Sequence, residues 1–158
     1  MQETKILFVC TYWGVRSQIA QLLMQSLNLA QVKIDSAGLE VGKIGGLPRD
    51  LMRVRGFELP DFSPATVFNR VREGTEYDYV ITLCSHQSQE NYAVLLDVVQ
   101  QLFEKSATLI HWNIDDFMAI GGRDDARVKS AEAIIESIEN NVQRIAAELG
   151  LMCYPVAD

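Results

Sequence analysis

Three side chains near the start of the chain have the types and spacing that suit chemistry on an anion. Cys10 is followed by five residues, and then by Arg16 and Ser17. A cysteine thiolate is a nucleophile, a guanidinium can bind two oxygens of one oxyanion side by side, and a serine hydroxyl can stabilise the thiolate by a hydrogen bond. The pattern therefore indicates a nucleophilic cysteine lying beneath a bound tetrahedral oxyanion.

The elements predicted around Cys10 support this interpretation. The apolar run at residues 6–9 is typical of a buried parallel strand, and apolar residues recur at helical spacing from residue 19 to residue 27. Cys10 thus lies where a strand turns into a helix. The first turn of a helix carries unpartnered N–H groups and the positive end of the helix dipole, so an oxyanion fits there and a thiol there loses its proton more easily. The predicted binding loop consists of Thr11, Tyr12, Trp13, Gly14, Val15 and Arg16.

Composition limits the functions to consider. With 158 residues, 48% of them hydrophobic and 22% charged, one globular domain over residues 1–158 is expected. The net charge of −7 argues against a nucleic-acid partner, which needs a basic face. No apolar run approaches the ~20 residues that span a bilayer, and no signal-peptide pattern opens the chain. Three widely spaced cysteines suit a reducing cytoplasm, and neither a cofactor nor a metal site is predicted.

Strands and helices alternate along the rest of the chain. Further strands are predicted at residues 32–35, 79–83 and 108–112, and helices at residues 48–54, 65–71 and 92–103. A last helix is predicted to be capped by Asp124 or Asp125 and to stop at Gly150. This alternation predicts an α/β fold, a doubly wound three-layer αβα sandwich. Cys84 follows the third strand, which puts it at the same edge of the sheet as Cys10.

The pattern Cys10-x5-Arg16-Ser17 after an N-terminal strand resembles the low-molecular-weight protein tyrosine phosphatase superfamily, which includes the thioredoxin-coupled arsenate reductases. The segments 36–38 (Ser-Ala-Gly), 80–84 (Val-Ile-Thr-Leu-Cys) and 111–116 (His-Trp-Asn-Ile-Asp-Asp) are similar to the arsenate reductase branch. The resemblance implies a four-stranded parallel sheet in the order 2-1-3-4. It also implies that the glycine-rich loop at residues 41–48 borders the site, and that Asp116 is the acid, with Asp115 as the second candidate.

The resemblance implies a cysteine-thiolate enzyme that acts on a tetrahedral oxyanion and is arsenate-reductase-like in layout, with a tyrosine phosphatase that hydrolyses aryl phosphate monoesters as the alternative within the family. In a phosphatase, Cys10 attacks phosphorus and Asp116 protonates the departing oxygen, then draws a proton from water. In an arsenate reductase, Cys10 attacks arsenic, and Cys84 then attacks Cys10 to release arsenite and leave a disulfide. Tyr12 and Trp13, two aromatic residues in the binding loop, leave a third class open, a protein that binds phosphate or arsenate without turnover. The expected partners are therefore a phosphate or arsenate oxyanion, with a phosphotyrosine protein or a thiol reductant (thioredoxin, glutaredoxin or a low-molecular-weight thiol).

Three parts of the chain depart from the family pattern. Residues 12–14 are Tyr-Trp-Gly where the family has glycine, asparagine and serine, and Phe117 stands where a proline usually follows the acid. Asn91 stands where the thioredoxin-coupled branch has its third cysteine. The missing cysteine favours a phosphatase, whereas the segment 111–116 favours a reductase.

The missing cysteine leaves three alternatives for Cys84. An outside thiol resolves a disulfide between Cys10 and Cys84, or Cys153 comes across from the end of the chain, or Cys84 is a buried small residue without a chemical role.

Overall fold

The computed structural model describes residues 3–11, 15–60, 65–85, 92–117 and 120–151, in which strands and helices alternate. The elements in chain order are β1 (Thr4–Cys10), α1 (Val15–Gln25), β2 (Val32–Gly38), α2 (Gly46–Val54), α3 (Val67–Arg72), β3 (Tyr79–Cys84), α4 (Tyr92–Phe103), β4 (Thr108–Asn113) and α5 (Asp124–Glu148). Each predicted strand and helix is present within a few residues of its predicted bounds.

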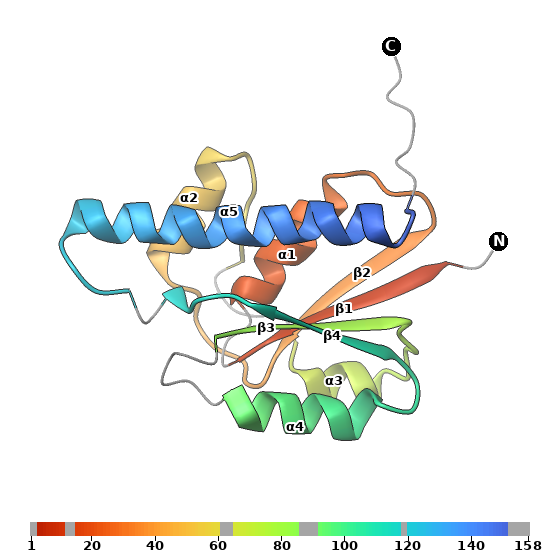
Figure 1. The fold of residues 1–158 in the computed structure, drawn as a ribbon. Coiled ribbons are helices and arrows are strands. Elements are labelled where there is room, and N and C mark those ends of the chain that lie inside the picture. Colours follow the sequence, from red (N-terminus) through yellow and green to blue (C-terminus); the bar gives the residue numbers. More distant parts are fainter. Residues whose placement is uncertain (1–2, 12–14, 61–64, 86–91, 118–119, 152–158) are drawn as a thin grey trace, which may run out of the picture.

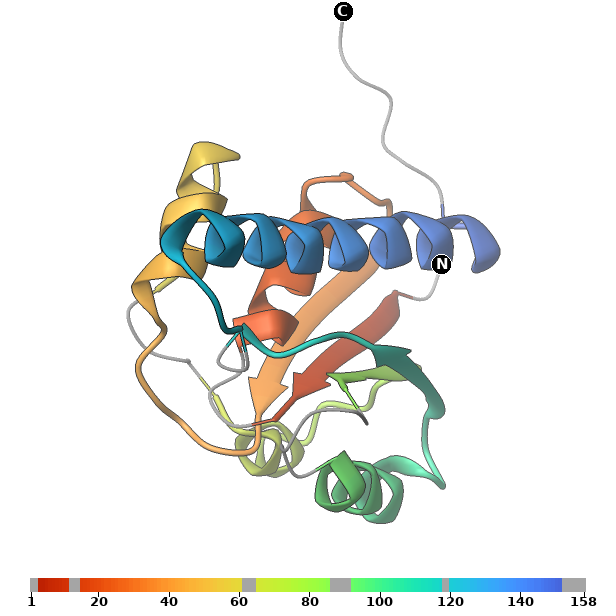
Figure 2. The ribbon, with the colours of Figure 1, turned by 60° about the vertical axis from the view of Figure 1, so that its left-hand side comes forward.

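The strands form one parallel sheet with β1 in its interior. The order is β2-β1-β3-β4, as the family resemblance implied. Cys10, the last residue of β1, pairs with Gly38 of β2 and with Leu83 of β3. Figure 2 shows the arrowheads of β1 and β2 at the same end of the sheet as the beginning of α1. The carboxyl edge of the sheet is therefore where the predicted nucleophile and the first turn of α1 meet.

Helices cover both faces of the sheet, which gives the predicted three layers (Figure 1). Side chains alternate along β1, so Ile6 and Phe8 join the core beneath α1, α2 and α5, whereas Leu7 and Val9 join the core above α3 and α4. Because β1 is buried on both faces, its sequence is a continuous apolar run rather than an alternating one.

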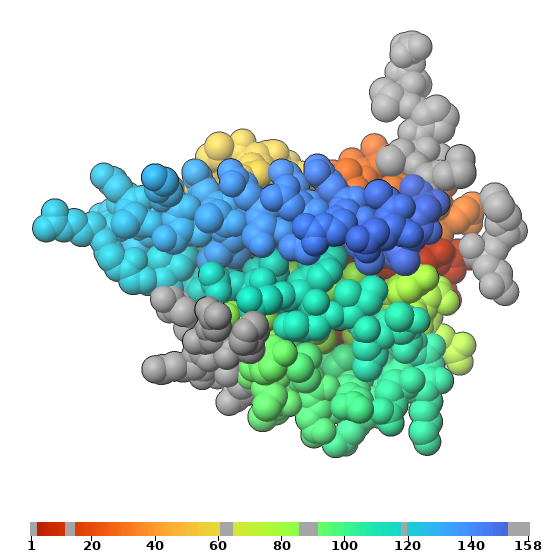
Figure 3. Space-filling view, in the orientation of Figure 1, coloured from red at the N-terminus to blue at the C-terminus, as the bar shows by residue number. Residues whose placement is uncertain are grey.

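The long helix α5 contributes one apolar stripe to the first of these cores. Its buried residues are Ala131, Ile134, Ile135, Ile138, Val142, Ile145 and Ala146. Strand β4, at one edge of the sheet, reaches the surface between α5 and α4, as Figure 3 shows. The helices on the two faces of the sheet thus leave the outer edge of β4 uncovered in this view.

Helix ends differ from the predictions at two places. Helix α2 begins at Gly46, so Pro48 lies in its first turn, where a missing N–H costs nothing. The prediction that Asp124 or Asp125 caps α5 is wrong, because Arg123 is the N-cap and makes no side-chain capping bond. Both aspartates lie instead in the first turn, where carboxylates interact favourably with the helix dipole. Gly150, at φ +66°, follows Leu149, the C-cap of α5, and has the left-handed conformation that favours glycine.

The core beneath α5 is expected to carry much of the stability. Ile135 is 0% exposed, so Ile135→Ala should lower the free energy of unfolding by about 2–5 kcal/mol through lost burial and a residual cavity. Val54 is 86% exposed, and Val54→Ala should change the free energy of unfolding by less than about 0.5 kcal/mol. Urea unfolding of both variants measures the difference, and equal losses would contradict the assigned core.

Candidate active site

Cys10, the last residue of β1, is buried. It is 1% exposed and belongs to the core beneath α1 and α5. Three of the residues predicted to bind the oxyanion, Tyr12, Trp13 and Gly14, lie outside the described residues, and the description resumes at Val15, the first residue of α1. The rest of the predicted loop, Thr11, Val15 and Arg16, lies directly beside Cys10 in the same pocket.

Ser17 contacts the sulfur of Cys10 twice. The Sγ–Oγ distance is 3.4 Å, with the thiol as donor, and the backbone N–H of Ser17 donates to the same sulfur at 3.4 Å. The hydroxyl of Ser17 in turn donates to the carbonyl of Ala37 at 3.0 Å. A chain of hydrogen bonds thus runs from the sulfur through Ser17 to the Ser-Ala-Gly segment at the end of β2. This chain suits a protonated thiol, and the hydroxyl must turn from Ala37 to the sulfur to stabilise a thiolate.

The guanidinium of Arg16 is buried and held from two sides. The residue is 3% exposed. Its Nη1 donates to the carbonyl of Ile114 at 2.8 Å, and its Nη2 donates to Oγ1 of Thr11 at 2.7 Å. These bonds connect the first turn of α1 to the end of β1 and to the segment that follows β4. Because two bonds fix the plane of the guanidinium, its orientation towards the pocket is determined before any ligand arrives.

The acidity of Cys10 differs from the prediction. Burial raises the pKa of the Cys10 thiol above its ordinary value of 9.0, and this effect outweighs the Arg16 charge and the hydrogen bonds from Ser17 and from the Arg16 N–H, which lower it. The expectation of a more acidic thiol is therefore wrong for the described structure. Position at a helix start indicates stabilisation of the thiolate, but it does not reveal how completely the sulfur is removed from water.

A pocket of about 280 Å³ opens above Cys10. Its lining residues are Cys10, Thr11, Val15, Arg16, Gly45, Gly46, Leu47, Pro48, Asp116, Phe117 and Arg127. The segment that begins α2 therefore forms one wall, as the resemblance implied for the loop at residues 41–48. The segment after β4 forms another wall, with Asp116 half-buried in it, whereas the neighbouring Asp115 is exposed and does not line the pocket.

Arg127 is the lining residue that the sequence analysis missed. It lies in the first turns of α5, more than a hundred residues from the Cys10 pattern, so no local spacing connects the two. One signal was present in the sequence. A cation near a helix N-terminus faces the positive end of the dipole, which is unfavourable without another reason for its presence.

The structure does not bring Cys84 into this pocket. Cys84 does lie at the carboxyl edge, next to the residue of β3 that pairs with Cys10. It is 0% exposed, however, and belongs to the core above α3 and α4, on the opposite face of the sheet from Cys10. Two cysteines whose side chains leave opposite faces cannot form a disulfide without movement of the backbone. Cys153, the other candidate partner, lies outside the described residues.

The part of the chain that the structure describes contains neither a cluster of metal ligands nor a membrane-spanning helix. Within it, no group of three or more His, Cys, Asp or Glu residues is arranged to hold a metal ion. None of the helices described there is both long and apolar enough to cross a membrane.

The fold and the site define a class: a parallel αβα sandwich with a cysteine, an arginine and an acid around one pocket at the carboxyl edge. The sequence model of the family "Low molecular weight phosphotyrosine protein phosphatase", a family of enzymes, matches residues 5–151. The chain therefore belongs to this family, in agreement with the resemblance in its motifs. A search of curated proteins found no significant match.

Solved structures with the same fold include proteins of two activities. An arsenate reductase from Archaeoglobus fulgidus is 19% identical, with 90% of this chain and 98% of that chain covered and a TM-score of 0.63. A tyrosine phosphatase from Erwinia amylovora is 21% identical, with 93% of each chain covered and a TM-score of 0.65. A thioredoxin-dependent arsenate reductase from Corynebacterium glutamicum is 21% identical with a TM-score of 0.61, and the match covers 94% of this chain but 63% of that chain.

The buried thiol gives a prediction for titration. Thiolate absorbance, measured as the difference between the protein and Cys10→Ala, should reach half of its full change above pH 9.0, because burial raises the pKa of Cys10. Since folding favours the protonated form, this contribution to the free energy of unfolding is present below the pKa of the unfolded thiol and is lost as pH rises through the folded pKa. Alkaline destabilisation should therefore be weaker in Cys10→Ala. A midpoint well below pH 9.0 would contradict the conclusion that burial outweighs the Arg16 charge and the hydrogen bonds in setting the pKa of Cys10.

Proposed function

We propose that this protein is a cysteine-dependent enzyme that acts on a tetrahedral oxyanion, and that its reaction is the hydrolysis of aryl phosphate monoesters. The observation that carries the proposal is that Cys10, Arg16 and Asp116 line one pocket. These are the three groups that such a hydrolysis needs: a nucleophile, a cation for the oxyanion and an acid for the leaving group. Membership in the family supports the same reaction.

In the proposed complex the phosphate lies between Cys10 and the first turn of α1. The guanidinium of Arg16, already oriented by Ile114 and Thr11, binds two of its oxygens. Backbone N–H groups of residues 11–16 surround the other oxygens, because the first turn of a helix is an anion site. The proposed binding residues are thus Thr11, Tyr12, Trp13, Gly14, Val15 and Arg16.

The proposed reaction has two steps. The sulfur of Cys10 attacks as a thiolate, a bond from sulfur to phosphorus forms, and the bond from phosphorus to the ester oxygen breaks while Asp116 gives that oxygen a proton. Water then attacks the phosphorus, Asp116 takes a proton from the water, and the bond from sulfur to phosphorus breaks to release phosphate. Ser17, which contacts the sulfur at 3.4 Å, stabilises the thiolate before attack and as the leaving group of the second step.

The walls of the pocket favour an aromatic leaving group. Leu47, Pro48 and Phe117 line it beyond the three chemical groups, and its volume of about 280 Å³ leaves room above a single oxyanion. An aryl ring that fills this space removes apolar surface from water. Phe117, which stands where the family usually has proline, thus contributes a surface for the ring.

Arsenate reduction is a second candidate, because two of the structures with this fold are called arsenate reductases. In that reaction arsenate is reduced to arsenite while two thiols become a disulfide, so Cys10 needs a second thiol. The sulfur of Cys84 belongs to the opposite core, which favours a thiol from outside the chain over Cys84. One related structure is called thioredoxin-dependent, and a reducing cytoplasm would supply such a donor and keep Cys10 and Cys84 reduced.

Three variants test the hydrolase. Cys10→Ser should abolish hydrolysis of an aryl phosphate, and Asp116→Asn should lower kcat by about 10²–10⁴-fold because the leaving group then receives no proton. Asp115→Asn is the matched control and should retain activity, since Asp115 is exposed and outside the pocket lining. Release of the aryl alcohol measures all three.

The same variants separate hydrolysis from simple binding. Phosphate should raise the melting temperature of Cys10→Ser, because a ligand that binds only the folded state stabilises it. If phosphate raises the melting temperature but the unaltered protein hydrolyses no aryl phosphate, the hydrolase proposal fails. The result would instead support a protein that binds phosphate without turnover.

The position of Cys84 gives a test of the second candidate. Cys84→Ala should leave aryl phosphate hydrolysis intact, because Cys84 does not line the pocket. Arsenite production from arsenate, with thioredoxin or a low-molecular-weight thiol added, should likewise persist in Cys84→Ala if the second thiol comes from outside. Loss of arsenite production in this variant, with hydrolysis retained, would make Cys84 the resolving thiol and contradict that assignment.

A further inference from the structure

We propose that Arg127 determines substrate specificity by selecting phosphotyrosine peptides that carry an acidic side chain beside the phosphotyrosine. The proposal rests on the proposed function, since it assigns a substrate class to the same pocket. It concerns the outer part of that pocket rather than the chemical groups at its base.

The surface at Arg127 continues beyond the pocket above Cys10. A second, shallower hollow of about 240 Å³ is lined by Leu47, Asp124, Arg127 and Val128. Leu47 and Arg127 line both hollows, so they stand at the junction between them. A substrate longer than a single aryl phosphate can extend from the pocket across this junction into the second hollow. Arg127 is thus placed to contact the residue next to the phosphorylated one.

The charge of Arg127 is available to a ligand. Other arginines near α2 and α5 are engaged: Arg53 pairs with Glu58 at 3.1 Å, and Arg55 pairs with Glu139 at 3.6 Å. Among the described residues, by contrast, the side chain of Arg127 makes no hydrogen bond and no ion pair, and the residue is exposed. A cation at the junction, in a protein of net charge −7, favours an anionic group on the substrate.

Two carboxylates near Arg127 limit where that anionic group can lie. Asp116 lines the pocket above Cys10 only and repels an anionic side chain placed there. Asp124 lines the second hollow only and repels an anion there. The favoured position is therefore at Arg127 itself, at the junction between the two hollows. A side chain adjacent to the phosphotyrosine meets this condition, whereas an acidic group further along the peptide does not.

Peptide binding tests the proposal independently of turnover. Two fluorescent phosphotyrosine peptides that differ by Glu or Gln beside the phosphotyrosine are bound to Cys10→Ser, and Kd is measured by anisotropy. The Glu peptide should bind about two- to fivefold more tightly, the range of an exposed ion pair, and the ratio should fall as salt is added. Adding Arg127→Met to Cys10→Ser should bring the ratio to about one.

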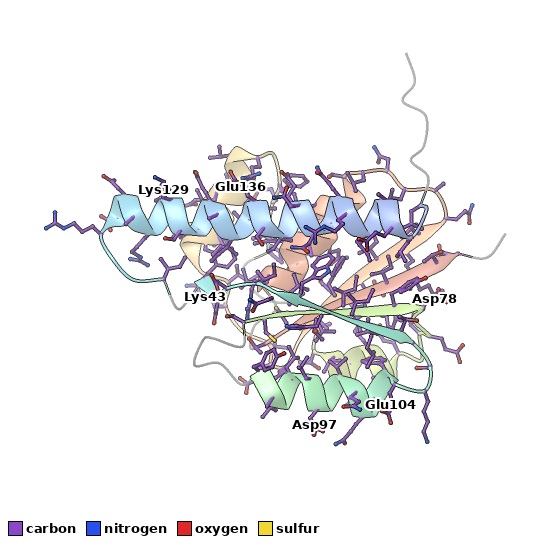
Figure 4. All side chains as sticks on the ribbon, in the orientation of Figure 1. Lys43, Asp78, Asp97, Glu104, Lys129 and Glu136 are labelled. Carbon is purple, nitrogen blue, oxygen red and sulfur yellow. The ribbon has the colours of Figure 1, made fainter. Side chains whose placement is uncertain are left out.

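Lys129→Met is the matched control. Lys129 is an exposed cation on α5 outside both pocket linings, and Figure 4 labels it on the side of the helix away from the sheet. Lys129→Met should leave the ratio of the Kd values for the Glu and Gln peptides unchanged. This control separates a local contact of Arg127 from the general effect of losing one positive charge.

Several outcomes would overturn the proposal. An Arg127 that binds the phosphate itself would weaken both peptides equally in Arg127→Met and leave their ratio as it was. A ratio near one in the Cys10→Ser protein, or no binding of either peptide, would also exclude the selection. Failure of the proposed function appears separately, as absent hydrolysis by the protein with Cys10 intact.

Discussion

The site depends on the burial of one positive charge, the guanidinium of Arg16. At 3% exposure it has lost nearly all contact with water, which is costly unless hydrogen bonds replace the lost hydration. Its bonds to Oγ1 of Thr11 and to the carbonyl of Ile114 tie α1 to the ends of β1 and β4. Asp116 follows Ile114 by two residues, so the bond that orients the cation also fixes the segment that carries the proposed acid.

The burial that orients Arg16 also sets the state of Cys10. Excluding water strengthens the attraction between the guanidinium and a thiolate, but it penalises the thiolate itself. Desolvation is the larger effect at Cys10, so the pKa of its thiol is raised. Ser17 is the group that can alter this balance. Its hydroxyl now donates to Ala37, and turning it towards the sulfur would add a hydrogen bond to the charged form.

Much of the fold could be predicted from the sequence because its signals are local. Continuous apolar runs marked the interior strands, and apolar periodicity marked α5 from Ile134 to its C-terminal end. The carboxyl edge followed from the parallel sheet, so Cys10, Arg16 and Asp116 could be assigned to one end. The face occupied by Cys84 could not be predicted, because it depends on the register in which Leu83 rather than Cys84 pairs with Cys10. Arg127 was missed for a related reason, since the packing of α5 alone brings it to the pocket.

The distribution of charge explains how an acidic chain can accept an anionic substrate. A net charge of −7 repels anions at long range, but salt screens exposed charges over about 8 Å. Within the pocket, the first turn of α1 and the buried guanidinium of Arg16 act at contact distance, where screening is weak. Attraction therefore begins only when the anion has reached the mouth. A second cation at that point, Arg127, extends the favourable region outward to the surface. Under the proposed function, the mouth rather than the base of the pocket is therefore the place where one phosphorylated substrate is distinguished from another.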